Sequence, residues 1–224
     1  QQIEILPSHR EARIRGLQSH KKKLDRTEPG GRTAVNLTGI DLDEIQRGFV
    51  LTEPDIYSPT TLVDVRFSML DEATGDLQHN DEVKVFSASA QSLARVRLIK
   101  SAKLKPGESG WLQLDFFDEM VLARGDHYIL RRPSPVETIG GGVVLDVHPG
   151  KRHKRFSQKV YDHFFMLETG SLKDQILDLI HSKQPVLAKE IIETSGLDQH
   201  RVMDELSVLL ENEIVLINST EKMI

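Results

Sequence analysis

The sequence contains no cysteine, which excludes disulfide bonds, zinc fingers and catalysis by a thiol. This absence also indicates a reducing compartment, and we expect a cytoplasmic protein. No run of about 18 apolar residues is present, so we predict no membrane-spanning helix and no membrane partner. Residues 1–5 lack an initiating methionine and the features of a signal peptide, and we expect them to be an internal segment of a longer protein.

Motifs that carry catalysis or nucleotide binding are also missing. There is no G-x-x-x-x-G-K-[ST] phosphate loop, no H-E-x-x-H and no G-x-S-x-G. The nine histidines are scattered without the spacing of metal ligands, and no spacing among the 34 acidic residues singles out an acid–base pair. We therefore predict no catalytic residue, no metal site and no cofactor in this chain, which would then not be an enzyme.

The overall charge is slightly acidic. Twenty-nine Lys and Arg residues stand against 34 Asp and Glu residues, which gives a net charge of -5. Such a chain is not attracted to nucleic acid over its whole surface, although a local basic patch is compatible with this composition. A length of 224 residues allows one to three compact domains.

Residues 1 to about 150 show short, β-branched-rich runs separated by turn signals, a pattern typical of barrels and sandwiches. The turn signals are Pro29-Gly30-Gly31, Pro106-Gly107, Arg124-Gly125-Asp126 and Gly140-Gly141-Gly142. Strands are predicted at residues 3–6, 12–19, 32–38, 48–52, 62–69, 82–86, 94–99, 110–116, 127–131 and 142–147. The prolines in residues 53–59 predict a linker, with a boundary near residue 55.

From about residue 150 the hydrophobic residues recur at helical spacing. Helices are predicted at residues 156–167, 172–182, 188–195 and 199–212, with a turn at Gly196 and a strand at 214–217. This order is typical of a winged helix-turn-helix. The predicted fold class is mainly β, with β-barrels followed by a C-terminal α-helical winged-helix module.

An Arg47-Gly48 pair begins the second strand of a strand–loop–strand segment over residues 29–51. Glycine permits close backbone approach at this point, and the neighbouring guanidinium can be directed at an anionic group. On the residues alone, an ordinary exposed surface arginine is the simpler interpretation of Arg47.

Two groups of motifs resemble a known family. The pattern Pro-Gly-x-Arg-x-Ala-Val-Asn-Leu at residues 29–37, followed by Arg-Gly-x-Val-Leu at 47–51, resembles the second domain of translational GTPases of the elongation factor Tu class. Residues 94–98, 104–108, 125–131 and 138–146 narrow the resemblance to the selenocysteine-specific elongation factors of bacteria (SelB), with Ile-Gly-Gly-Gly-Val-Val-Leu-Asp at 139–146 the most discriminating string. The resemblance covers nearly the whole chain and is weakest in the C-terminal module.

This resemblance implies elongation-factor-type barrels and a division of the chain into three parts. Residues 1–54 would be a partial β-barrel at the end of domain II, residues 55–150 the domain III barrel, and residues 151–224 a linker helix with the first winged helix. It implies binding of selenocysteyl-tRNA and its delivery to the ribosome at UGA codons. GTP and magnesium would be bound by a GTPase domain upstream of this segment, and the messenger-RNA hairpin by later winged helices.

The resemblance also implies the roles of particular residues. Arg47 matches the arginine that lines the pocket for the selenocysteyl group, which is a selenolate anion at neutral pH. A guanidinium favours that anion over a neutral serine side chain. The third domain of the family contacts tRNA, and the basic residues suited to its phosphates are Arg95, Arg97, Lys100, Lys103 and Lys105.

Simpler interpretations of these charges remain open. Arg95 and Arg97 share one face of a strand and could form a solvated face that prevents edge pairing. The basic run at 151–155 is more simply explained as solvation of the interdomain helix, and residues 21–23 as a loop. Residues 86–90 lack the glycine of the family's turn, which puts the geometry of that loop in question.

A second function class is a transcription regulator that binds DNA through the winged helix and carries a β effector domain. The predicted recognition helix argues against it, because phosphate is repelled by acidic side chains. We expect this module to be a structural spacer. The acidic residues are Asp204, Glu205, Glu211 and the neighbouring Glu213, against Arg201.

Overall fold

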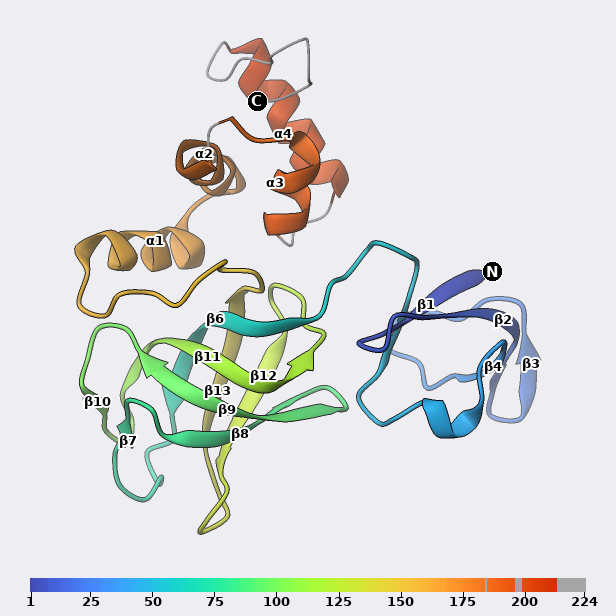
Figure 1. The fold of residues 1–224 in the computed structure, drawn as a ribbon, viewed down its shortest axis with the longest axis horizontal. Coiled ribbons are helices and arrows are strands. Elements are labelled where there is room, and N and C mark those ends of the chain that lie inside the picture. The colour runs from blue at the N-terminus through green and yellow to red at the C-terminus, as the bar shows by residue number, and fades with distance from the viewer. Residues whose placement is uncertain (184, 196–198, 213–224) are drawn as a thin grey trace.

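The computed structural model describes residues 1–183, 185–195 and 199–212. Figure 1 shows a small N-terminal sheet, a barrel beside it, and helices that lie over one side of the barrel. Within these described residues, no helix combines the length and apolar character needed to cross a membrane.

Five strands form the N-terminal sheet. They are β1 (Gln2–Leu6), β2 (Arg10–Ser19), β3 (Lys22–Leu24), β4 (Ala34–Thr38) and β5 (Val50–Thr52). β1 pairs with both β2 and β5, and β2 also pairs with β3 and β4, all antiparallel. A small core of Ile3, Ile5 and Ala12 lies on one face. Residues 21–23 were predicted as a loop, but residues 22 and 23 belong to β3, so this prediction is wrong for them. Left-handed backbone at His20 and Lys21 forms a tight turn, and this turn lets β3 pair with β2.

Six strands close into a barrel in the order β11-β6-β13-β12-β8-β9. They are β6 (Thr60–Met69), β8 (Glu82–Ser87), β9 (Ala90–Leu98), β11 (Ser109–Met120), β12 (His127–Arg132) and β13 (Glu137–Asp146). The short strands β7 (Leu77–Gln78) and β10 (Lys103–Leu104) pair separately. Alternate residues point inward, so that Val63, Val65 and Phe67 of β6 are completely buried. The predicted mainly β fold with a barrel is confirmed.

Residues 140–142, predicted as a turn, lie inside strand β13, so that prediction is wrong. A Cβ atom added to these glycines would lie against the backbone oxygens of Ser68, Tyr128 and Arg66, closer than real Cβ atoms approach. The three glycines therefore let β13 lie tightly between β6 and β12.

The C-terminal helices are α1 (Gln158–Thr169), α2 (Leu172–Lys183), α3 (Ala188–Ser195) and α4 (Gln199–Glu211). The last three share a core that includes Ile176, Ile191 and Leu206. The helices predicted by periodicity are thus present, and the fold ends in a helical region as predicted. Gly196 and the strand predicted at 214–217 lie outside the described residues, so the winged helix stays a prediction.

Helix α1 packs on the outside of the barrel. Phe164 of α1 is completely buried and stacks on the ring of Trp111 from β11, with a centroid distance of 5.7 Å. The indole Nε1 of Trp111 donates to Glu168 (2.6 Å), whose carboxylate also pairs with Arg66 of β6 (3.0 Å). The barrel and α1 are therefore joined by an apolar contact with polar contacts at its rim.

The N-terminal sheet meets the barrel at Gly48. This glycine has a φ of +99°, and an added Cβ would lie 2.8 Å from the Cα atom of Ala90 at the start of β9. The close backbone approach that glycine permits at this position is made to the barrel. In the β8–β9 turn, Ala88 takes the left-handed conformation (φ +48°) that glycine would otherwise supply.

We predict that Gly142→Ala lowers the free energy of unfolding by about 3 kcal/mol or more, because the methyl group collides with rigid backbone of β6. Urea unfolding followed by circular dichroism measures this loss. Gly16→Ala is the control, since an added Cβ there meets nothing within 4 Å. Equal stability of the two variants would contradict the close approach of β13 and β6.

We predict that Gly48→Ala lowers the free energy of unfolding by about 1–3 kcal/mol more than Gly30→Ala does. Both glycines have positive φ, but only Gly48 faces a neighbour, so the difference isolates the contact with Ala90. The same urea titration measures both variants. An equal loss in the two would show that the sheet and the barrel do not touch at Gly48.

Candidate functional site

The outer face of β9 presents the two arginines predicted from its alternating pattern. Arg95 and Arg97 both point away from the barrel core, as their spacing of two requires. Arg95 lies 3.7 Å from the carboxylate of Glu82 and 5.3 Å from the ring centroid of Phe117. Its charge is therefore partly balanced by a neighbouring strand.

Arg97 is less exposed than Arg95 and lies under the linker to α1. One of its terminal nitrogens donates to the carbonyl of His153 (3.3 Å), while its buried Nε has no hydrogen-bond partner among the described residues. Burial lowers the pKa of the Arg97 guanidinium, and the positive charges of Arg152 and Arg155 lower it further, with Asp115 acting in the opposite direction. An anion bound here would relieve this concentration of positive charge.

The basic run at residues 151–155 brings two more arginines to the same place. Arg152 pairs with Asp115 of β11 (2.7 Å). Arg155 donates to the backbone oxygens of Leu98 (2.8 Å) and Ser101 (2.9 Å) at the end of β9. We call Arg95, Arg97, Arg152 and Arg155 the arginine strip. The sequence analysis noted the basic run but could not place it beside β9.

The three lysines of the predicted set do not all join the strip. Lys100 follows β9, with its ammonium 5.8 Å from the ring centroid of Tyr161. Lys103 lies on β10 and pairs with Asp76 at 2.5 Å, and that hydrogen bond raises the pKa of Lys103. Lys105 follows β10 and is exposed. The structure therefore groups the two predicted arginines, but it sets Lys103 on a separate small sheet and Lys105 just after it.

Arg47 is exposed in the turn before β5. The contact of its neighbour Gly48 with Ala90 places this turn at the start of the strand that carries Arg95 and Arg97. At about 3.3 Å per residue, Arg95 lies roughly 16 Å along β9 from Ala90. The Arg47 turn and the arginine strip thus lie along one strand.

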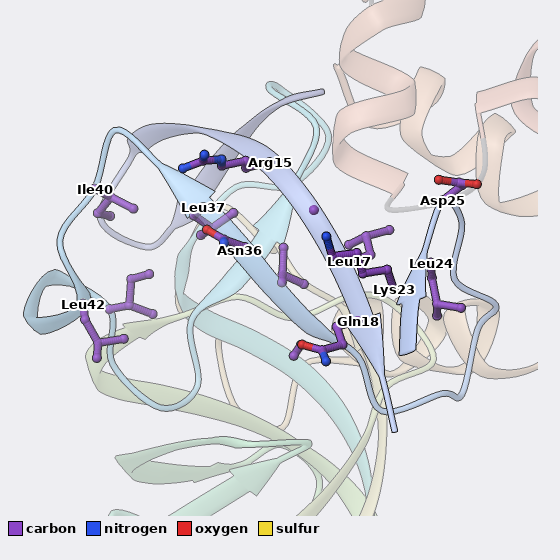
Figure 2. A pocket seen from close by; sticks show the side chains of 14 residues that line it. Arg15, Leu17, Gln18, Lys23, Leu24, Asp25, Asn36, Leu37, Ile40 and Leu42 are labelled. Atoms are coloured by element: carbon purple, nitrogen blue, oxygen red, sulfur yellow. The ribbon is translucent and has the colours of Figure 1, made fainter. Parts of the chain in front are cut away.

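A hollow of about 720 Å³ opens in the N-terminal sheet, and Arg47 does not line it. Figure 2 shows Leu17, Leu24 and Leu37 from three different strands around it, with Arg15 and Lys23 among the polar side chains. Its full lining is Arg15, Gly16, Leu17, Gln18, Lys23, Leu24, Asp25, Ala34, Val35, Asn36, Leu37, Ile40, Leu42 and Ile45.

A second group of polar residues, which sequence spacing did not suggest, lies between the barrel and α1. His153 of the linker contacts the completely buried Asp64 of β6, with 2.5 Å between Nε2 and Oδ2. His163 of α1 completes a group of three whose ligand-type atoms all lie within 4.8 Å of one another. Burial raises the pKa of Asp64, although the hydrogen bond with His153 acts in the opposite direction.

Helix α4 carries its charges as the sequence analysis described. Val202, Leu206 and Leu209 face the helical core, while Asp204 and Glu211 are exposed. Glu213 lies outside the described residues. The described part of this helix therefore presents acidic side chains where a DNA-reading helix needs basic ones.

In comparisons with known proteins, the barrel is the part of the chain that matches a family model. Residues 64–151 match the family described as selenocysteine-specific elongation factor, beta-barrel domain. A selenocysteine-specific elongation factor of Desulfomicrobium baculatum is 34% identical over 158 residues, which cover 70% of this chain and 25% of the relative. A selenocysteine-specific elongation factor of Haemophilus influenzae is 23% identical over 151 residues, which cover 67% of this chain and 24% of the relative.

The chain thus spans about a quarter of the length of the curated relatives it matches. The matched region contains five of the six strands of the closed barrel in full and most of β6. Residues 64–151 thus match the β-barrel domain of the selenocysteine-specific elongation factors, and the chain belongs to that family.

Proposed function

We propose that this chain is part of a GTP-dependent elongation factor that binds selenocysteyl-tRNA and delivers it to the ribosome at UGA codons. The similarity to selenocysteine-specific elongation factors of two bacteria supports this assignment. The observation that carries tRNA binding is the arginine strip, which lies on β9 of the barrel and on the linker that packs against it. Among the described residues, its four guanidiniums outnumber the two carboxylates that pair with them, those of Glu82 and Asp115.

The strip would bind the phosphates of the tRNA. Guanidiniums make charge-assisted, bidentate hydrogen bonds to phosphate oxygens, and neutralising phosphates releases bound counterions. Lys100 is exposed just after the end of β9 and extends the strip beyond that strand. Contacts of this kind hold the tRNA but do not read its sequence, so specificity must come from elsewhere.

Arg47 would supply part of that specificity. In this proposal its guanidinium lies next to the selenolate of the selenocysteyl group and forms an ion pair that the neutral serine hydroxyl cannot form. Arg47 is exposed in its turn and therefore accessible to a ligand. The Gly48–Ala90 contact would hold this turn in a fixed position relative to the tRNA-binding barrel.

The remaining roles would lie outside these 224 residues. We propose that GTP and magnesium are bound elsewhere in the protein, where GTP is also hydrolysed, and that this chain binds without catalysing. The messenger-RNA hairpin would be bound by further winged helices, and the protein would act in the cytoplasm. A DNA-binding transcription regulator is not favoured, given the family and the acidic exposed residues of α4.

The proposal is tested by fluorescence-anisotropy binding of the full 224-residue chain to selenocysteine tRNA charged with selenocysteine, a charged elongator tRNA and a DNA duplex at two salt concentrations. We expect the selenocysteine tRNA to bind most tightly. Tightest binding to the DNA duplex would overturn the proposal in favour of the regulator.

We predict that Arg95→Ala weakens tRNA binding about five- to tenfold, close to 1 kcal/mol. It should also reduce the slope of log K against log salt by roughly 0.7–1, the contribution of one phosphate contact. Anisotropy titrations at several salt concentrations measure both values. Lys103→Ala is the matched control and should change little, because Asp76 already holds its ammonium. The same loss in both variants would show that charge in general, and not the strip, binds tRNA.

We predict that Arg47→Ala reduces the preference for selenocysteyl-tRNA over seryl-tRNA at least about fivefold, the effect of losing an ion pair of roughly 1 kcal/mol. Binding of both aminoacylated forms to the same chain gives the preference as a ratio. Arg47→Lys should keep part of this preference. Arg32→Ala, which removes an exposed arginine shortly before β4, should keep all of it. An unchanged ratio in Arg47→Ala would remove Arg47 from the pocket.

A further inference from the structure

Three separate parts of the chain converge on one polar group between the barrel and α1. Asp64 comes from β6, His153 from the linker and His163 from α1. The side chain of Asp64 is completely buried, while His153 is 11% and His163 is 26% exposed. Two imidazole nitrogens and a carboxylate oxygen are therefore held together in a place largely shielded from water.

Neighbouring groups orient each of these side chains. The amide nitrogen of Gln113 in β11 donates to Oδ1 of Asp64 (2.9 Å). The other carboxylate oxygen, Oδ2, is therefore available on the side of His153. Nδ1 of His163 lies 3.1 Å from the carboxylate of Asp178 in α2, which leaves Nε2 of that ring free to bind a ligand. A histidine whose second nitrogen is held by a carboxylate is the usual arrangement around protein-bound metal ions.

The linker is oriented in the same way. The amide oxygen of Gln113 accepts a hydrogen bond from the backbone N–H of His153 (3.0 Å), and its nitrogen donates to the carbonyl of Lys151 (3.1 Å). One buried amide thus positions both Asp64 and the segment that carries His153. The three side chains are therefore built into the fold and do not meet by chance on a mobile surface.

A second carboxyl group lies close to this group. Asp146 of β13 is the register partner of Asp64, so the completely buried Asp64 and the partly buried Asp146 lie on neighbouring strands. A divalent ion held by Asp64 would reduce the repulsion between the two carboxylates.

We propose that Asp64, His153 and His163 bind a divalent transition-metal ion of the zinc type, which fastens the linker and α1 to the barrel. Two nitrogen ligands and one oxygen ligand suit Zn²⁺, Co²⁺ or Ni²⁺ better than Mg²⁺ or Ca²⁺, which prefer oxygen alone. Three protein ligands leave a fourth tetrahedral position for water.

The dimensions of the group are compatible with such an ion. Ligand atoms around a tetrahedral ion with bonds of about 2.0–2.2 Å lie roughly 3.4 Å apart. This value falls between the 2.5 Å of the Asp64–His153 contact and the 4.8 Å within which all three ligand atoms lie. Binding therefore requires His153 and Asp64 to separate by about 1 Å, with the ion replacing their shared hydrogen bond.

Titration of the full chain with Co²⁺ tests the site, because tetrahedral Co²⁺ with histidine ligands gives a visible absorption band. We expect the band to saturate at one ion per chain, and calorimetry with Zn²⁺ to give the same stoichiometry. His163→Gln should lose the band and weaken Zn²⁺ binding at least tenfold, and Asp178→Asn should weaken it about 10–100-fold. His127→Gln, an exposed histidine at the start of β12, should behave as the unchanged chain does.

Thermal unfolding provides a second measurement that does not depend on the absorption band. Zn²⁺ should raise the Tm of the unchanged chain and of His127→Gln but not that of His163→Gln. Circular dichroism without metal confirms that each variant is folded before titration. Absence of saturable binding, or equal binding by His163→Gln and His127→Gln, would overturn the proposal and leave the group as a hydrogen-bonded network only.

Discussion

The tight approach of β13 to β6 and β12 is the constraint on which the rest of the structure depends. Residues 140–142 carry no side chains, and this allows the three strands to come together so that the six-stranded ring closes. A closed ring has no free edge within the barrel and encloses a core around Phe67. The outer face of β9 and the docking surface of α1 take their positions from this ring. The arginine strip and the Asp64 group are thus both consequences of one backbone arrangement.

Much of this fold could be predicted because strands and helices leave periodic patterns in a sequence. The alternation in β9 placed Arg95 and Arg97 on one face, and the structure agrees. The glycines at 140–142 were misassigned because glycine marks both turns and close strand contacts, and local sequence does not separate the two. The positions of Asp64 and His153, 89 residues apart, follow only from barrel closure and the path of the linker. No local pattern could have brought these two side chains together.

The candidate tRNA-binding surface shows the same division between local and tertiary information. A net charge of -5 gives no indication of a basic face, and the run at 151–155 was more simply explained by solvation. The fold places that run against β9, where Arg152 and Arg155 join Arg95 and Arg97. The assignment of Arg47 depended on resemblance to a family, because one exposed arginine beside a glycine carries little information by itself. Only its position next to the barrel adds a physical reason for its proposed role.

The contact between Trp111 and Phe164 has a consequence for how this protein can be observed. The chain contains a single tryptophan, and its ring is stacked between the barrel and α1 with its N–H bonded to Glu168. Separation of α1 from the barrel would expose this indole to water and remove its hydrogen bond, whereas rearrangements within the N-terminal sheet would leave it untouched. The fluorescence of Trp111 therefore reports specifically on the attachment of the helical region to the barrel.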